Sequence, residues 1–286
     1  MRFSIVIPTL NEEQNIARCV EAIRLGVEQP DEVLIVDGFS TDATRTVAEG
    51  LGARVYLNHA RHAAGGRNVG IQKATGDVVV FTDADCIPRR EWLAQIKDAF
   101  GNDAGLEGVG GPMVALEPRT RIEAFWGRVF LKEIMPFPNE SFIVRNHIFR
   151  GGFLTANCAY QRKTLLNLGG FDEWFGNNAE DIDLFWRAID EGAKLRYLPS
   201  AVVAHSFPST LPAMIKKNFR NGVSSSKLQK RYGNWFQIDR YLYGTLLSNI
   251  FGMATCKPGA TLYCLQLISH LMGKYYGSFK VGVINL

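Results

Sequence analysis

The chain has 286 residues, of which 47% are hydrophobic and 21% are charged. These proportions are ordinary for a folded protein and exclude a disordered chain or a polytopic membrane protein. The formal net charge is only +4, and much of the excess lies between Lys216 and Arg231. A nucleic-acid-binding protein carries a stronger basic footprint, so no nucleic-acid partner is expected.

The cysteines and the N-terminus indicate a cytoplasmic protein. Five cysteines, with no Cys-x-x-Cys pair, argue against a disulfide framework or a thiolate metal site. The chain runs from Met1 directly into a strand pattern, without the apolar region of a signal peptide. We therefore expect a cytoplasmic location, with the cytoplasmic face of a membrane as the alternative.

The first hundred residues alternate apolar runs with helical patterns, which predicts βαβ units around a mostly parallel sheet flanked by helices. The strands expected there are continuously apolar, which indicates burial on both faces. We predict strands at 3–7, 32–36, 53–57 and 77–81, and helices near 12–25, 42–51 and 65–75. Further along we predict a strand near 107–115, a helix at 119–131, an irregular stretch at 132–150, short strands near 153–160, a helix at 179–191, and strands at 194–198 and 201–204.

Polar clusters follow three of the predicted strands. They are the segments 8–12, 37–42 and 82–85. Because right-handed crossovers bring the carboxyl ends of parallel strands to one edge, where open α/β sheets bind ligands, the three clusters predict one site.

Asp83 and Asp85 come directly after a buried strand, with one small residue between them. Carboxylates at this spacing suit Mg²⁺ or Mn²⁺ bound together with substrate phosphates. An isolated Asp-x-Asp is weak evidence, because such pairs are common in solvated turns. Its place beside two other polar loops makes the metal interpretation the stronger one.

Other residues of the predicted edge suit structural roles, binding roles or both. Asp37 suits a hydrogen bond to a base or ribose, or a cap on the following turn. Asn11 or Thr9 suits a cap on the first helix, and Glu12 or Glu13 suits the positive end of that helix dipole. Arg67 and the nearby Arg61 suit phosphate, although Arg61 is equally well explained as a solvated side chain.

The glycines at 65, 66 and 70 do not have the spacing of a dinucleotide fingerprint, and they follow a polar loop rather than a strand. We therefore exclude a Rossmann dehydrogenase. The glycines instead permit a close backbone approach beside Arg67.

A second acidic centre lies at Glu180 and Asp181, in the first turn of the predicted helix 179–191. A carboxylate there suits a general base for an acceptor hydroxyl, and the alternative is that the pair only complements the helix dipole. His205 ends a strand, where a histidine is more often structural than metal-binding. It is the candidate if the metal takes a third protein ligand.

Several motifs resemble those of the family 2 glycosyltransferases, whose fold is the GT-A fold. The resemblance covers roughly residues 1–222. It rests on Ile5 to Glu12, on Val36 to Gly38 with Ser40 to Asp42, on Arg67-Asn68, on Phe81 to Asp85, on Gly170 to Glu173, on Glu180 to Leu184 and on His205.

The resemblance implies an inverting, single-displacement transfer from a UDP- or GDP-sugar. Pro8, Thr9, Glu12 and Asp37 would bind the donor's nucleoside. Asp85, with Asp83 nearby and His205 as a further ligand, would hold Mn²⁺ or Mg²⁺ on the diphosphate. Arg67 and Glu180 would lie in the substrate site, and Asp181 would be the catalytic base.

The C-terminal part is predicted to be a helical extension at 223–286, after a catalytic domain at 1–222. Arg220 and its basic neighbours suit either the donor's diphosphate or an anionic membrane surface. The uncharged stretches 241–256 and 258–273 are short of the ~20 residues of a transmembrane helix. The extension therefore suits peripheral membrane contact, or packing on the core or on another subunit.

A basic segment before apolar helices favours a lipid-linked acceptor, and two alternatives to this function remain open. One is a transferase for a soluble acceptor, and another is a non-catalytic nucleotide-sugar-binding module. A sugar-nucleotide pyrophosphorylase is disfavoured, because Pro8 to Glu12 stand where a glycine-rich, basic loop is expected.

Overall fold

A computed structural model describes residues 1–147, 153–233, 240–256 and 258–283. The chain forms two compact units. Unit 1 comprises Met1–Leu116 and Phe130–Ser206, and unit 2 comprises Glu117–Val129 and Phe207–Leu286. The predicted boundary at residue 222 falls inside a helix of unit 2, and the predicted division into domains stays a prediction.

Unit 1 is built on an eight-stranded sheet in the order β3-β2-β1-β4-β9-β6-β10-β8. Strands β3, β2, β1 and β4 are parallel neighbours, and β9 runs antiparallel to both β4 and β6. The strands are β1 (Phe3–Thr9), β2 (Glu32–Asp37), β3 (Arg54–Leu57), β4 (Val78–Phe81), β6 (Gly108–Gly110), β8 (Phe142–Val144), β9 (Cys158–Gln161) and β10 (Leu195–Tyr197). The predicted, mostly parallel sheet is confirmed.

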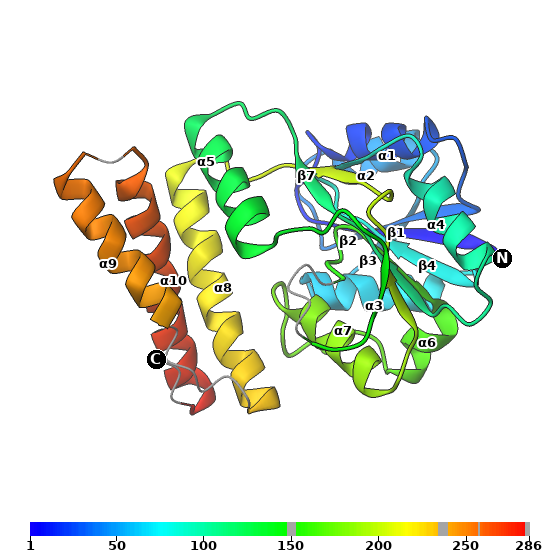
Figure 1. Cartoon of the computed structure of the whole chain (residues 1–286). Helices are drawn as coiled ribbons and strands as arrows, with labels where there is room; N and C mark the ends of the chain where they lie inside the picture. The colour runs from blue at the N-terminus through cyan, green and yellow to red at the C-terminus, as the bar shows by residue number, and fades with distance from the viewer. Residues whose placement is uncertain (148–152, 234–239, 257, 284–286) are drawn as a thin grey trace. The chain divides into compact units, whose positions relative to one another are not determined.

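Helices cover both faces of this sheet, and Figure 1 shows α1, α2 and α4 on one side and α3, α6 and α7 on the other. All four residues of β4 are buried, which confirms the predicted two-sided burial of that strand. Gly70 of α3 lies so close to β1 that an added Cβ would meet Val6. The helices are α1 (Ile16–Arg24), α2 (Thr44–Gly50), α3 (Ala63–Lys73), α4 (Trp92–Gly101), α6 (Arg162–Asn167) and α7 (Glu180–Asp190).

A second, three-stranded sheet has the order β5-β11-β7 and consists of β5 (Cys86–Pro88), β11 (Val203–His205) and β7 (Met113–Ala115). The predicted single strand at 107–115 is therefore wrong, because it divides between β6 of the large sheet and β7 of the small one. The break falls at Gly111 and Pro112. A Cβ on Gly111 would lie 2.1 Å from the carbonyl oxygen of Ala201, and proline cannot donate to a strand ladder.

Two other sequence predictions are corrected, and two helices were missed. The short strands expected near 153–160 reduce to β9, and helices α4 and α6 were not predicted. The stretch 132–150 is not wholly irregular, because it contains β8 and most of a π-helical turn, η1 (Phe130–Ile134). Its last residues, 148–150, lie outside the described residues.

Unit 2 contains α5 (Arg121–Val129), α8 (Leu211–Tyr232), α9 (Arg240–Ala254) and α10 (Ala260–Val281). Helices α8 and α10 touch along their backbones, because Gly222, Gly273 and Gly277 leave no room for a side chain between them. Phe125 of α5 meets Tyr263 of α10 edge to face, with ring centroids 4.9 Å apart. Among the described residues, no helix combines the length and the apolar character that a bilayer span requires.

Candidate active site

The three predicted polar clusters meet at the carboxyl edge of β2, β1 and β4. Thr9 and Asp37 are register partners at the ends of β1 and β2, and Asp83 follows β4. The structure therefore brings the clusters together, as the strand order requires.

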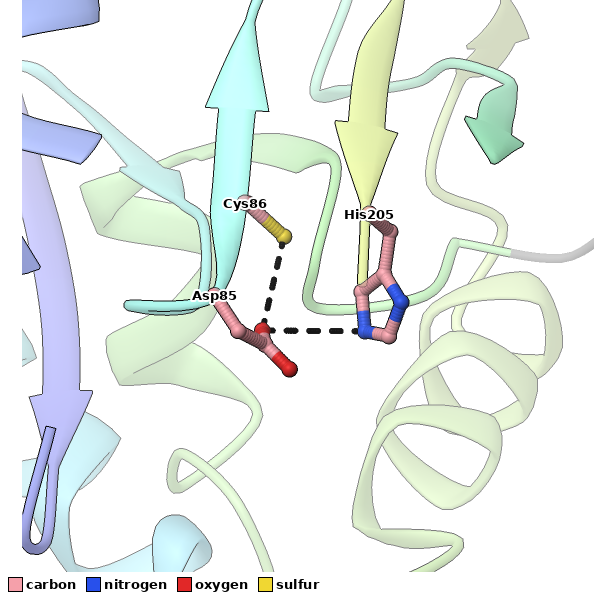
Figure 2. A group of neighbouring side chains, drawn as sticks. All are labelled: Asp85, Cys86 and His205. Atoms are coloured by element: carbon pink, nitrogen blue, oxygen red, sulfur yellow. Dashed lines mark hydrogen bonds and ion pairs between the residues drawn. The ribbon is translucent and has the colours of Figure 1, made fainter. Parts of the chain in front are cut away.

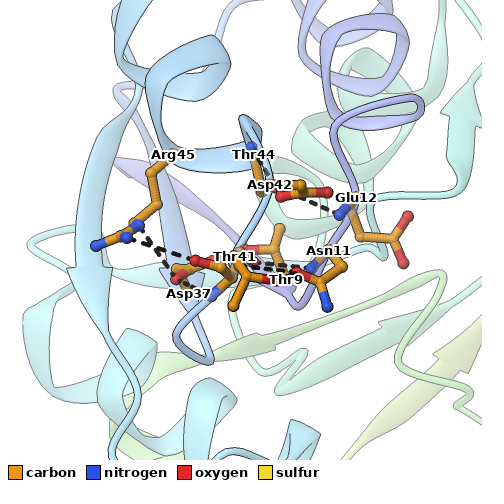
Figure 3. Close-up of polar contacts among 9 residues, drawn as sticks. Thr9, Asn11, Glu12, Asp37, Thr41, Asp42, Thr44 and Arg45 are labelled. Atoms are coloured by element: carbon orange, nitrogen blue, oxygen red, sulfur yellow. Dashed lines mark hydrogen bonds and ion pairs between the residues drawn. The ribbon is translucent and has the colours of Figure 1, made fainter.

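Asp37 is fully buried at this edge and has its hydrogen-bond partners within the protein (Figure 3). Its carboxylate accepts the Ser40 N–H at 2.9 Å, the Ser40 hydroxyl, and the Thr9 hydroxyl at 3.3 Å. Arg45 Nε lies 3.7 Å away. These contacts support the capping interpretation of Asp37, and its contact with a nucleoside stays a prediction.

Side-chain hydrogen bonds join the loops that follow β1 and β2 (Figure 3). Asn11 Oδ1 accepts the N–H of Thr41, and Thr44 Oγ1 accepts the N–H of Glu12. Asn11 has a φ of +57°, which asparagine tolerates better than most residues. The two loops therefore form one wall of the edge.

Glu12 and Pro8 occupy different parts of that wall. Burial raises the pKa of Glu12, the hydrogen bond from Asn15 opposes this effect, and the charges of Asp85 and Asp83 add to it. Glu12 is therefore in the electrostatic field of the acidic pair. Pro8 is half-buried within β1 and would lie 3.3 Å from a Cβ on Gly66, so it packs against the start of α3.

Arg67 links the two acidic centres that the sequence suggested separately. Its buried guanidinium donates from Nη1 to Oε1 of Glu180 at 2.6 Å, and from Nη2 to Oδ1 of Asp83 at 2.8 Å. Burial opposes the charged form, but the charges of Asp83 and Glu180 outweigh it and raise the pKa of Arg67. Arg67 is therefore a permanent cation between two carboxylates.

The segment next to Arg67 is fastened to the loop before α7. The amide of Asn68 donates to the carbonyl of Phe171 at 2.9 Å and accepts its N–H at 2.8 Å. Gly170 has a φ of +73°, and a Cβ there would lie 2.5 Å from Asn68 Oδ1. Two of the motifs that resemble family 2, Arg67-Asn68 and Gly170-Phe171, are therefore in direct contact with each other.

Glu180 and Asp181 begin α7, next to Ala179, whose φ of +69° is strained for a residue with a Cβ. Burial, followed by the charge of Asp181, raises the pKa of Glu180 to about 7 against the opposing effect of Arg67. Burial also raises the pKa of Asp181, although Arg67 and the N–H groups of Ile182 and Thr155 oppose this. As whole residues, Asp181 is half-buried and Glu180 is buried.

Asp85 faces His205 because β5 and β11 pair antiparallel, with His205 opposite Cys86 in register (Figure 2). His205 Nε2 lies 3.7 Å from Asp85 Oδ1. Cys86 Sγ lies 3.9 Å from the same oxygen, but burial raises the pKa of this thiol well above its usual range, so it stays neutral.

This donor set fits a hard divalent cation. A carboxylate oxygen and an imidazole nitrogen converge, whereas the nearby sulfur is a neutral thiol and a poor ligand for Mg²⁺ or Mn²⁺. Asp83, two residues before Asp85 in the chain, is half-buried and has one oxygen held by Arg67. Asp85 and His205, with Asp83 nearby, are the residues that would hold the ion.

The structure adds a small aromatic cluster that the sequence did not suggest. Phe39, just after β2, has a φ of +66°, and its ring meets His59 with centroids 5.1 Å apart. The exposed Arg61 lies over the same ring at 5.0 Å, so the solvated interpretation of Arg61 is incomplete. The sequence signal that could have indicated this cluster is a large aromatic residue, Phe39, within a tight polar turn.

Arg220 lies exposed on α8 of unit 2, and its contact with a diphosphate stays a prediction.

Comparison with known proteins identifies the family. Residues 4–157, more than half of the chain, match Glycosyl transferase family 2. The chain belongs to this family. The resemblance drawn from the motifs is therefore confirmed, although the match ends before Glu180, Asp181 and His205.

Several curated proteins resemble this family 2 chain. Pre-mycofactocin glycosyltransferase of Mycobacterium tuberculosis is 29% identical over 80% of the chain, which spans about half (48%) of that protein's length. Glycosyltransferase AglE of Haloferax volcanii is 26% identical, covering 77% of this chain and 71% of the relative. A dolichyl N-acetyl-α-D-glucosaminyl phosphate glucuronosyltransferase of Methanococcus voltae is 25% identical, with coverages of 81% and 75%.

Among solved structures, the chain resembles glucosyl-3-phosphoglycerate synthase from Mycobacterium tuberculosis, crystallised with Mn²⁺, UDP-glucose and phosphoglyceric acid. The TM-score is 0.59 at 22% identity, and the alignment covers 81% of this chain and 80% of the synthase. This likeness, with the strand order above, confirms the GT-A-like fold with its C-terminal helices.

Proposed function

We propose that the chain is an inverting glycosyltransferase that moves a sugar from a UDP- or GDP-sugar to a hydroxyl of a lipid-linked acceptor. The observation that carries this proposal is the buried link from Asp83 through Arg67 to Glu180, with Asp181 next in the chain. A single displacement needs one group that stabilises the leaving diphosphate and another that deprotonates the acceptor. In this family 2 fold, the carboxylates near Asp85 would serve the first purpose and Asp181 the second.

Residues at the metal edge would bind the donor. Asp85 and His205, with Asp83, would hold Mn²⁺ or Mg²⁺, which when bound neutralises charge on the departing diphosphate. Pro8, Thr9, Glu12 and Asp37 would form the nucleoside side of the donor site, with the buried Asp37 holding the turn in place. The synthase that shares this fold is named with Mn²⁺ and UDP-glucose, which supports such a donor here.

Arg67 would act mainly by positioning. Its two contacts hold Asp83 and Glu180 at fixed places on neighbouring elements. Because it is buried between two acidic groups, its charge offsets theirs and keeps negative charge from accumulating beside an anionic donor.

Asp181 would take the proton from the acceptor hydroxyl as its oxygen attacks the anomeric carbon. The bond from that carbon to the phosphate oxygen breaks, and its electron pair leaves with the nucleoside diphosphate. Attack from the opposite face inverts the configuration. A phosphate acceptor is already ionised and needs no base, so a requirement for Asp181 favours a hydroxyl over a phosphate.

The nature of the acceptor has two candidate answers, each with a supporting observation. The Methanococcus voltae relative is named for a dolichyl phosphate-linked sugar, which supports a lipid-linked acceptor. The synthase of the same fold is named for phosphoglycerate, which supports a soluble one. We favour the lipid-linked acceptor because residues 207–286 are strongly basic and because α9 and α10 expose large apolar side chains.

The test is a screen of UDP- and GDP-sugars with Mn²⁺ for protection against thermal unfolding, followed by transfer assays. A stabilising donor should then be consumed with a polyprenyl-linked glycan and not with phosphoglycerate. Stabilisation without transfer or hydrolysis for any acceptor would instead indicate a non-catalytic nucleotide-sugar-binding module. No stabilisation by any donor would contradict the proposal.

A further inference from the structure

Unit 2 has a charge distribution unlike that of the rest of the chain. Residues 207–286 contain ten Lys and Arg and a single acidic residue, Asp239, which gives a formal charge of +9. Residues 1–206 carry −5, so the modest total of +4 conceals a strongly basic C-terminal part. Helices α8, α9 and α10 contain no acidic residue.

One face of α10 is apolar and exposed. Ile268, Met272, Tyr275, Tyr276 and Phe279 recur at the helical spacing i, i+4, i+7, i+8 and i+11, and all are exposed. Phe279 is 85% exposed, although burial of such a ring would be favourable. The opposite face is occupied, because Gly273 and Gly277 pack against α8.

Helix α9 extends this face. Leu247 and Phe251, one turn apart, are 67% and 72% exposed. The two helices are joined side by side, because Leu246 and Tyr243 pack on Leu267 and Leu271 of α10, and the hydroxyls of Tyr243 and Tyr275 lie 2.7 Å apart. We call the exposed apolar residues of α9 and α10 the apolar face: Leu247, Ile250, Phe251, Ile268, Met272, Tyr275, Tyr276 and Phe279.

Basic residues are exposed on α8 and α10, and Lys280 adjoins the apolar face. Lys280 follows Phe279, and its Nζ lies 5.7 Å from the centroid of the Tyr276 ring. On α8, Lys216, Arg220 and Lys230 are exposed at positions that share one side of the helix, at i, i+4 and i+14.

We infer that unit 2 docks through the apolar face onto an anionic lipid bilayer. Exposed aliphatic and aromatic side chains beside Lys280, on helices α8 to α10 that carry basic and no acidic residues, are what an interfacial helix needs to insert its apolar face while its charges meet acidic headgroups. Tyrosines suit the headgroup level, because their rings are apolar and their hydroxyls polar. Insertion of the apolar face alone would place α9 and α10 along the bilayer surface at the level of the headgroups.

The charges decide between this occupant and its competitors. A second copy of the chain would bring two strongly basic units together, and their repulsion opposes pairing. A nucleic acid would match the charge but would leave the large apolar side chains uncovered. Only an acidic, amphiphilic surface satisfies both features.

The test is flotation of the full-length protein with vesicles of phosphatidylcholine, with and without phosphatidylglycerol, in the absence of donor and metal. Binding is expected only to the anionic vesicles, and it should weaken as salt rises. Because this readout needs no catalysis, it can succeed or fail independently of the proposed transferase activity.

Two variants separate the contributions. The double variant Phe251→Ser and Phe279→Ser should weaken vesicle binding at least ~10-fold, because it removes two aromatic rings that would be buried in the bilayer. Lys216→Glu with Lys230→Glu should weaken it roughly fivefold for each lysine and reduce its salt dependence. Leu25→Ser is the matched control, because Leu25 in unit 1 is 73% exposed and should not affect binding.

Other outcomes would overturn the inference. Equal binding of the serine double variant and the wild type would show that the apolar face does not insert. Failure to float with anionic vesicles, together with a dimer in light scattering that the serine variant dissociates, would identify a second copy as the occupant. Retention of a labelled oligonucleotide without vesicle binding would identify a nucleic acid.

Discussion

Arg67 and Glu180 form a buried ion pair between residues 113 positions apart in the chain, with Nη1 and Oε1 2.6 Å from each other. The pair fastens α7 to α3, and the second contact of Arg67 reaches Asp83 after β4. One side chain thus sets the spacing of the two acidic centres on which the proposed transfer depends.

Removal of Arg67 should therefore cost both stability and activity. Arg67→Met leaves two carboxylates without their shared cation, and we expect a loss of about 3–5 kcal/mol in the free energy of unfolding. Chemical denaturation measures this. The exposed Arg18 of α1 offers a control, and Arg18→Met should change stability by less than ~0.5 kcal/mol.

A double-mutant cycle tests whether the cost of this substitution arises from the ion pair. Arg67→Met combined with Glu180→Gln should cost less than the sum of the single substitutions, because the second removes the carboxylate that the first leaves unpaired. Simple additivity would contradict a direct coupling between the two side chains.

Asp181→Asn should abolish transfer while donor binding is kept. The amide is close to the carboxylate in shape but cannot accept the acceptor's proton, so kcat should fall at least ~100-fold. Thermal stabilisation by the donor with Mn²⁺ should be unchanged. Glu191→Gln, at the exposed end of the same helix, is the control and should retain full turnover. Normal turnover of the Asp181 variant would exclude it as the base.

Asp85→Ala should act on donor binding itself. Without its carboxylate the metal site loses a hard oxygen ligand. The affinity for UDP or GDP in the presence of Mn²⁺ should therefore fall at least ~10-fold. His205→Ala should show a loss in the same direction. Titration calorimetry measures both, and Asp98→Asn, on the exposed side of α4, should bind as the wild type does. An unaltered metal requirement in the Asp85 variant would argue against this ion site.

The sequence predicted the parallel half of the sheet and its polar edge because each strand there is a continuous apolar run followed by its own polar loop. Asp83 and Asp37 could be placed in this way. The link from Arg67 to Glu180 could not, because it depends on which helix of the second half returns beside α3, and periodicity does not encode that.

Local geometry explains the remaining differences. The break at Gly111-Pro112 is readable only once Ala201 is known to lie against it. The role of Asp37 was left open because the same acidic residue suits a ligand or a turn. The structure shows that the Asp37 carboxylate accepts hydrogen bonds from the hydroxyls of Ser40 and Thr9, which the sequence alone does not reveal.

The pH dependence of stability should carry the signature of Glu180. A carboxyl group whose pKa is raised on folding binds its proton more tightly in the folded state. Its contribution to stability is therefore full at low pH and is lost as the pH rises through the folded value. For Glu180 the loss runs from about pH 4.5 to about 7.

Glu180→Gln should remove this loss, because the amide stays neutral at every pH. At pH 8 the variant should be more stable than the wild type by about 1–3 kcal/mol, and at pH 5 the difference should shrink toward zero. Thermal unfolding at both values measures the change, with Glu191→Gln as a control that should show no such pH dependence. If the Gln variant were less stable than the wild type at pH 8, the attraction of Arg67 would outweigh the cost of burying the charged carboxylate.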